Sequence, residues 1–170
     1  MKLKFTLPHL FAPGVPPREN AEGLRVALDS LIAWNCHYLR HHSARPLYRA
    51  GVMYARTDDW ETIPALYARG DHGTSEPDSN HPAKFGVFGD CKSLTGALIA
   101  EWRMQGRFAE PQFRFAPMGD GHHMFHILVW NGGPPGEARS YEDPSFKLGM
   151  GRDELAHFGL GRQGGGGAYG

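Results

Sequence analysis

The sequence Gly89-Asp90-Cys91-Lys92-Ser93-Leu94 opens a predicted helix that runs to about Gly106. Aspartate is a favoured N-cap residue because its side chain accepts hydrogen bonds from the first N–H groups of a helix. Gly106 is a natural helix end, because glycine tolerates the left-handed conformation at the C′ position. Between these ends, side chains at helical spacing form one mostly apolar stripe: Leu94, Ala97, Leu98, Glu101, Trp102 and Gln105.

Cys91 falls in the first turn of this predicted helix. Free N–H groups and the helix dipole favour negative charge there. We therefore expect the pKa of this thiol to be lowered from about 8.5 toward that of a thiolate at neutral pH. A thiolate is a nucleophile, and catalysis by it also requires a base and a group that orients the base.

Length and composition predict one domain, residues 1–160, followed by a disordered glycine-rich tail at 161–170. The chain has 18 basic and 18 acidic residues. This balance argues against a nucleic-acid partner and against a polybasic membrane anchor. Nothing in the patterning sets an oligomeric state.

The first ten residues, MKLKFTLPHL, alternate polar and apolar side chains and lack the apolar core of a signal peptide. No apolar run approaches the roughly 20 residues that a membrane helix needs. Two cysteines, Cys36 and Cys91, are too few for a disulfide framework. We therefore expect a cytoplasmic protein in which Cys36 is a core residue.

Patterns of hydrophobicity predict the remaining elements. Residues 2–7 are expected to form a strand, 8–17 an extended linker and 19–41 a long helix. Residues 47–56 read as extended, 60–70 as a short helix or turn, and 70–83 as a loop before the Cys91 helix. After Gly106 the period changes to that of strands, at 112–116, 124–130 and 139–143. The order predicts an α+β fold in which the thiol-bearing helix packs on an antiparallel sheet.

Two polar residues of this predicted sheet complete a possible catalytic set. His126 points to the face opposite Phe125, Ile127 and Val129, so it needs a polar cleft on its own side. Asp143 ends the following strand, where hairpin pairing brings side chains together and a carboxylate can accept from the imidazole. Cys91, His126 and Asp143 thus match the nucleophile, base and orienting group of a cysteine enzyme.

Other readings of these residues stay open. A cysteine at a helix start is most often structural, and a strand histidine is usually a surface or core residue. The ten histidines also allow a zinc site, with His37 and His41 spaced i, i+4 and His122, His123 and His126 near Cys91. Because the chain lacks a CxxC pair and an HExxH run, we expect no metal and no cofactor.

At these residues the sequence resembles the transglutaminase-like superfamily, a papain-related cysteine fold, and in particular its small phage, prophage and bacterial members. The matching segments cover about residues 45–150: Leu47-Tyr48-Arg49-Ala50-Gly51-Val52, Trp60-Glu61-Thr62-Ile63-Pro64, Gly89-Asp90-Cys91, His126-Ile127-Leu128-Val129, Glu142-Asp143-Pro144-Ser145 and Leu148-Gly149-Met150.

The resemblance implies a transglutaminase-like core with Cys91 as nucleophile, His126 as general acid and base, and Asp143 as the orienting carboxylate. His123 is a rival for the histidine. An oxyanion pocket that includes the Cys91 N–H is implied as well, and Trp60 is expected to line the cleft.

The expected function is therefore a cysteine hydrolase, a peptidase or amidase that acts on a protein or peptide through a thioester at Cys91. The alternatives are acyl transfer to an amine, as in a transglutaminase, and a non-enzymatic phage assembly or binding module that keeps the fold.

Overall fold

The structure, a computed structural model, describes residues 2–3, 14–56, 60–68, 87–118 and 122–160. Helices and strands follow one another along the described chain in the order β1 Lys2–Leu3, α1 Pro17–His41, β2 Val52–Tyr54, β3 Trp60–Glu61, α2 Ile63–Ala68, β4 Val87–Gly89, α3 Cys91–Met104, β5 Glu110–Pro117, β6 His123–Trp130, β7 Tyr141–Glu142, α4 Pro144–Lys147 and α5 Arg152–Ala156. The α+β expectation is confirmed at this level.

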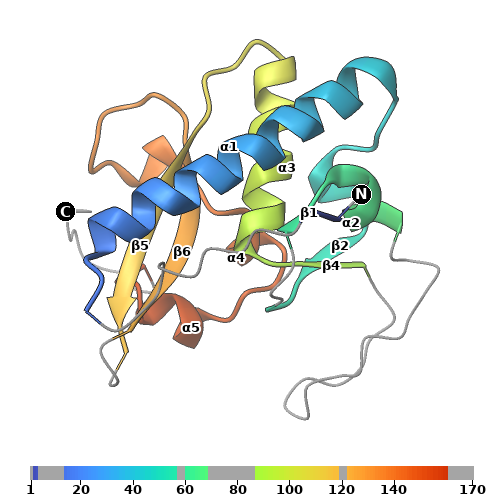
Figure 1. The fold of residues 1–170 in the computed structure, drawn as a ribbon. Coiled ribbons are helices and arrows are strands. Elements are labelled where there is room, and N and C mark those ends of the chain that lie inside the picture. Colours follow the sequence, from blue (N-terminus) through green and yellow to red (C-terminus); the bar gives the residue numbers. More distant parts are fainter. Residues whose placement is uncertain (1, 4–13, 57–59, 69–86, 119–121, 161–170) are drawn as a thin grey trace.

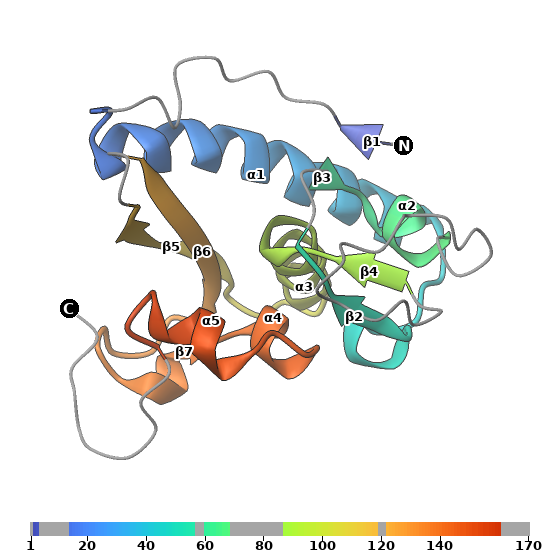
Figure 2. The ribbon, with the colours of Figure 1, turned by 90° about the horizontal axis from the view of Figure 1, so that it is seen from below.

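Helix α3 lies at the centre of the fold (Figures 1 and 2). Seen from below, α1 covers one side of it, β5 and β6 another, α4 a third, and the β2–β4 pair with α2 the fourth. Every residue from Cys91 to Ala100 is consequently buried. The apolar stripe predicted from the sequence is present, but its neighbours around the helix are buried as well.

Both predicted ends of α3 are confirmed. The Asp90 side chain accepts hydrogen bonds from the N–H groups of Lys92 and Ser93, both at 3.1 Å. At the other end Gly106 has a φ of +73°, and its N–H donates to the Arg103 carbonyl. The next N–H, that of Arg107, donates to the Trp102 carbonyl, which completes a Schellman motif.

A glycine lets α1 approach α3 closely. A Cβ atom on Gly96 would lie only 2.8 Å from Cδ2 of Leu31, a residue that is fully buried on α1. The contact joins the two longest helices of the described chain. Their facing side chains, including Leu24, Leu28, Leu31, Ile32, Leu94 and Leu98, form much of the core.

Strands β5, β6 and β7 form an antiparallel sheet with β6 in the middle. β5 and β6 pair along eight residues, from Glu110 opposite Trp130 to Pro117 opposite His123. β7 pairs only with Val129 and Trp130 of β6. The predicted antiparallel sheet is therefore confirmed, with its third strand shorter than the expected 139–143 because residues 138–140 form a 3₁₀ turn.

Two further strand pairs lie outside this sheet. β2 runs parallel to β4, and β1 pairs antiparallel with β3. The parallel pair leads directly into the α3 N-terminus, because β4 ends at Gly89 and the helix begins two residues later. The sequence did not predict it, since a three-residue strand carries almost no periodic signal.

The expected extended segment 47–56 is wrong in its first part. Residues 47–49 form a 3₁₀ turn, in which the Arg49 N–H donates to the Pro46 carbonyl. The Leu47 N–H is held by the Glu101 carboxylate at 2.6 Å, a contact from α3 that local sequence does not reveal. The strand begins only at Val52.

The predicted long helix is confirmed as α1, which begins at Pro17, a residue favoured in the first turn of a helix. The segment 60–70 holds strand β3 and helix α2. Most of the expected 2–7 strand, part of the 8–17 linker, the whole 70–83 loop and the 161–170 tail lie outside the described residues.

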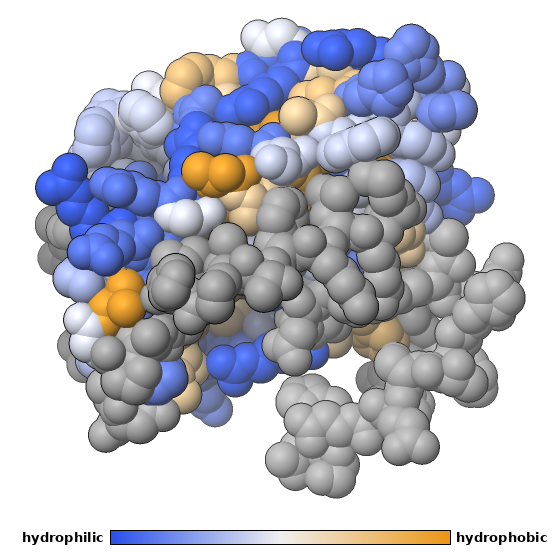
Figure 3. Space-filling view, viewed as in Figure 1, coloured by the Kyte–Doolittle hydropathy of each residue, from blue (hydrophilic) through white to orange (hydrophobic). Residues whose placement is uncertain are grey.

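The surface on the α1 side is mainly hydrophilic where it is described, with single hydrophobic side chains among polar ones (Figure 3). Val26 and Trp34 are exposed on α1, at 69% and 46%. Within the described ranges, no helix combines the length and the apolar character needed to cross a bilayer.

Candidate active site around Cys91, His126 and Asp143

The first turns of α3 pack against β6 at Ile127, beyond the two residues of β6 that pair with β7. The Thr95 hydroxyl donates to the Ile127 carbonyl at 3.1 Å, and both residues are completely buried. In an antiparallel strand the N–H and C=O of one residue point to the same side, so the Ile127 N–H also faces α3. There it hydrogen-bonds to the Cys91 sulfur, which lowers the pKa of that thiol. One strand residue therefore anchors both Cys91 and Thr95.

His126, the preceding residue of β6, contacts the predicted carboxylate. Its Nε2 atom lies 2.9 Å from Oδ2 of Asp143, and its side chain is only 1% exposed. Because a carboxylate accepts, Nε2 is the donor in this contact, and in the neutral imidazole Nδ1 is then the acceptor. The expected contact between these two residues is confirmed.

Asp143 is itself fixed by the helix that follows it. Its other oxygen, Oδ1, accepts the Phe146 N–H at 3.0 Å, which caps α4. Pro144 at the first helical position suits this cap, since its missing N–H is one that a helix start leaves unpaired. The carboxylate thus holds an imidazole with one oxygen and a helix with the other.

The burial of His126 differs from the sequence expectation. Because side chains alternate along β6, His126 lies on the other face of the strand from Ile127 and Val129, and those two residues do face the core. Yet His126 and Leu128 are buried as well, at 1% and 3% exposure. Both faces of β6 are covered at this point, so the imidazole lies in an enclosed site rather than an open cleft.

The expected lowering of the Cys91 pKa is wrong. The thiol is buried, with the residue 8% exposed, and this burial raises its pKa to about 12. The Asp90 carboxylate contributes to this raised pKa, whereas the Lys92 ammonium and the Ile127 N–H oppose the rise. Loss of water around the charged form outweighs the favourable position at the helix start.

A buried ion pair adjoins the thiol. The Lys92 ammonium hydrogen-bonds to the Asp90 carboxylate, and the two side chains are 10% and 4% exposed. The ammonium also lies 5.7 Å from the centre of the Trp60 ring and 5.8 Å from that of Phe125. Burial raises the pKa of Asp90, and the positive charge of Lys92 opposes that rise.

The structure brings Cys91, His126 and Asp143 to one region through their shared neighbours. The Cys91 sulfur accepts a hydrogen bond from the N–H of Ile127, the residue after His126. The negative charge of Asp143 contributes to the raised pKa of the thiol. Among the described residues, however, no hydrogen bond joins the Cys91 sulfur to His126. Cys91 and His126 therefore adjoin the same stretch of β6 without a formed thiol–imidazole pair.

The structure separates the other candidates. His123 begins β6 opposite Pro117 and is half-exposed, three residues away from the Asp143 contact, which His126 makes. Trp60 is buried beside Lys92 rather than lining an open cleft. Lys92 was missed as a site residue, because a lysine in a helix normally reads as solvent-facing. Its position directly after Cys91 was the available signal.

The zinc alternative gains no support from the described part of the chain, where no group of three or more His, Cys, Asp or Glu side chains gathers closely enough to hold a metal ion. His37 and His41 do lie together on α1, with ring centres 4.8 Å apart. His126 is engaged by Asp143.

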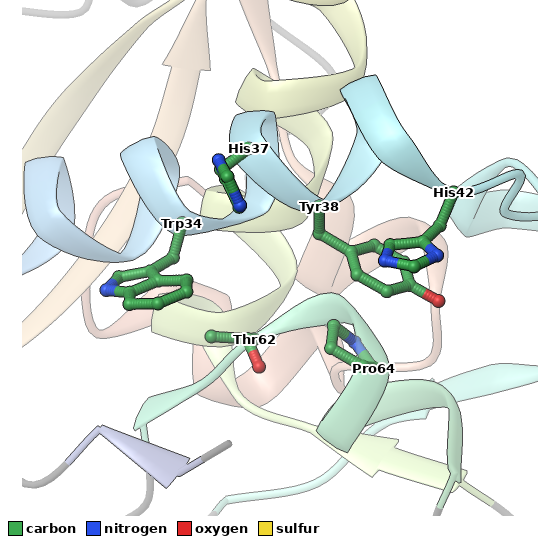
Figure 4. A pocket seen from close by; sticks show the side chains of 6 residues that line it. All are labelled: Trp34, His37, Tyr38, His42, Thr62 and Pro64. Carbon is green, nitrogen blue, oxygen red and sulfur yellow. The ribbon is translucent and has the colours of Figure 1, made fainter.

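A separate hollow lies between α1 and the start of α2 (Figure 4). Its volume is about 220 Å³, and rings from α1 and from the residue that follows it face Thr62 and Pro64 across it: Trp34, His37, Tyr38 and His42. It is smaller than the roughly 300–1,000 Å³ of most ligand sites. None of its lining residues belongs to the Cys91 region, so it is not the site that the sequence predicts.

No family model matches the sequence, and neither a curated protein nor a solved structure matches the chain.

Proposed function

We propose that the protein is a cysteine hydrolase that cleaves an amide bond of a protein or peptide through a thioester at Cys91. The observation that carries this proposal is the buried His126–Asp143 hydrogen bond on the strand against which Cys91 packs. The transglutaminase-like resemblance of the surrounding segments supports it, and the finer fold assignment to that core is part of the same proposal.

In the proposed reaction the Cys91 thiol gives its proton to Nδ1 of His126, and the sulfur attacks the amide carbon. His126 then donates this proton to the departing amine as the carbon–nitrogen bond breaks, leaving a thioester. Water, losing a proton to His126, attacks the thioester, and the released sulfur takes the proton back. Asp143 keeps the imidazole oriented throughout.

The start of α3 offers a donor for the developing oxyanion. The Asp90 cap takes the N–H groups of Lys92 and Ser93 rather than that of Cys91. This N–H points out of the helix start, where negative charge is favoured. An amine in place of water would turn the same thioester into a transamidation product, so the acceptor depends on what reaches the site.

One observation favours a second function. A thiol with a pKa of about 12 is almost entirely protonated at neutral pH. A phage-related assembly or binding module that keeps the fold without turnover would tolerate such a thiol. The pH dependence of thiol reactivity separates the two functions.

The test is the rate of Cys91 alkylation by iodoacetamide between pH 5 and 11, followed by intact mass and peptide mapping. The half-buried Cys36 serves as an internal reference. For a hydrolase we expect the His126→Ala variant to raise the midpoint, because the wild-type imidazole stabilises the ionised thiol. A midpoint unmoved by the substitution favours the module.

Turnover is tested separately on a mixture of unstructured peptides, with release of amines as the readout. Cys91→Ala should abolish release, whereas Cys36→Ala should leave it intact. Equal release by wild type and Cys91→Ala would refute the proposed nucleophile.

A further inference from the structure

The last described segment, residues 151–160, contacts His126 of the proposed active site and Tyr54 of β2. It contains helix α5, and of its side chains Leu155 is buried while Glu154 and Phe158 are half-buried. The segment closes on itself, since the Leu160 N–H donates to the Leu155 carbonyl at 3.1 Å. We call residues 151–160 the cover segment.

Phe158 packs on the imidazole of the proposed base. Its ring centre is 5.3 Å from that of His126, with the ring planes inclined by 33°. Asp143 occupies the edge of the imidazole, so Phe158 covers one of its faces. A substrate amide that is to receive a proton from His126 needs space beside this ring, and the cover segment takes part of that space.

The cover segment is tied to β2 by one polar contact. The Tyr54 hydroxyl donates to the Glu154 carboxylate at 2.8 Å. Burial raises the pKa of Tyr54, with the carboxylate adding to the rise, so the hydroxyl remains a donor at any physiological pH. An electrostatic interaction with Cys91 adds to the rise of the Tyr54 pKa.

The rest of the attachment is slight. α5 has five residues, far fewer than a helix needs to be stable alone. Its N-cap is Gly151, which has no side chain to cap the helix, and Gly149 has a φ of +113° with open space around it. Within the described part of the chain, the cover segment is held closed by the Leu155 side chain, the Tyr54–Glu154 bond and the Phe158 ring.

Building on the proposed function, we propose that Phe158 occupies the subsite for a large apolar side chain of a peptide substrate. The cover segment then acts as an internal occupant that a substrate displaces. It accounts for the ring that covers His126 in a protein whose proposed reaction needs this imidazole to be reached.

The first test compares Cys91 alkylation at pH 8 in full-length Tyr54→Phe, Glu154→Ala and Phe158→Ala variants. Asp153→Ala is the matched control, because Asp153 is the exposed neighbour of Glu154 on the same helix. We expect about a tenfold faster reaction in Tyr54→Phe and Glu154→Ala, because each loses one hydrogen bond to a charged group. Phe158→Ala should also react faster, because it removes the ring that packs on His126. The control should react at the wild-type rate.

Alkylation of Cys36 in the same samples shows whether a variant has loosened as a whole. Faster reaction at Cys91 alone supports the cover segment. Unchanged Cys91 rates in all three variants, or equal acceleration at both cysteines, would overturn it. Tyr54→Phe, which removes a single oxygen atom, keeps the test decisive should a larger truncation unfold the protein.

The second test asks which side chain the vacated subsite takes. In Phe158→Ala, N-acetyl-phenylalaninamide should slow Cys91 alkylation, whereas N-acetyl-glycinamide should not. Equal effects of the two amides, or no effect of either, would refute the apolar subsite. The midpoint of the pH profile and its response to His126→Ala report on the proposed hydrolase independently, so failure of one proposal is distinguishable from failure of the other.

Discussion

The Thr95 hydroxyl donates to the Ile127 carbonyl at 3.1 Å, joining the buried central helix to the middle strand of the sheet. Thr95→Val keeps the shape of the side chain and removes this donor. We expect it to lower the free energy of unfolding by about 1–3 kcal/mol, because a buried carbonyl loses its partner. Urea unfolding measures the change. Thr95→Ser keeps the hydroxyl and should cost less; an equal loss in both variants would contradict the assignment.

The raised pKa of Cys91 predicts a loss of stability at high pH. The folded thiol holds its proton up to about pH 12, whereas the reference value is 9.0. Between these values the unfolded state loses the proton first, so the free energy of unfolding falls as pH rises, by at most about 1.4 kcal/mol per pH unit. Well below pH 9.0 the Cys91 thiol is protonated in both the folded and the unfolded state, so it does not change the free energy of unfolding there.

The measurement is urea unfolding of wild type and Cys91→Ser at several pH values from 7 to 11. Subtracting the two series removes the contribution of the buried tyrosines, which both proteins share. The difference should be constant up to about pH 9 and then shrink. A constant difference throughout would show that the thiol is not buried as a neutral group.

The buried Asp90–Lys92 pair predicts a large loss of stability when Lys92 is replaced, and a partial recovery when Asp90 is replaced as well. Lys92→Met leaves the buried Asp90 carboxylate without its ammonium, which typically costs about 3–5 kcal/mol. Adding Asp90→Asn removes the uncompensated charge and keeps an N-cap. Thermal melts should therefore show the double variant to be more stable than Lys92→Met alone. If the losses simply add, the two side chains are not coupled.

Asp143→Asn separates the two contacts of this carboxylate. Asparagine caps a helix about as well as aspartate, so α4 should form and stability should change little. The imidazole loses its anionic partner, and we expect turnover by the proposed hydrolase to fall by about 10²–10⁴-fold. Asp143→Ala, which removes both contacts, should lose stability as well as activity. Wild-type turnover in Asp143→Asn would refute the orienting role.

Gly96 predicts a packing limit between α1 and α3. A Cβ there would meet the Leu31 side chain at 2.8 Å, so Gly96→Val should destabilise the fold by about 1–3 kcal/mol. Gly96→Val/Leu31→Ala tests the cause, since the smaller residue makes room. If stability is not partly restored in the double variant, the clash lies elsewhere.

The features predicted correctly from the sequence are those encoded locally. The N-cap at Asp90 and the end at Gly106 depend on residues within one turn of the helix. The alternation along β6 and the nearness of Asp143 follow from a hairpin-like return of the chain. Local signals of this kind are sufficient to assign Cys91 to a helix start and His126 to a strand that the Asp143 segment rejoins.

The features that the sequence did not predict correctly depend on distant parts of the chain. The 3₁₀ turn at Leu47 is held by Glu101, 54 residues away. The Cys91 pKa was expected to fall because the helix start is visible in sequence, whereas the elements that bury the thiol are not. Likewise the contact of Phe158 with His126 joins segments with no shared pattern.

Cys91 and Thr95 are both anchored to the main chain of Ile127, so the geometry of the site depends on the register of β6. A strand can shift against its neighbour only in whole residues, and a shift by one residue turns every side chain to the opposite face. Such a slip of β6 would point the backbone groups of residue 127 at β5 and swing His126 away from Asp143. Because strand register changes only in whole residues, the distance between the Cys91 sulfur and the His126 imidazole changes in large steps. A register shift would therefore disrupt the arrangement of these two residues completely rather than gradually.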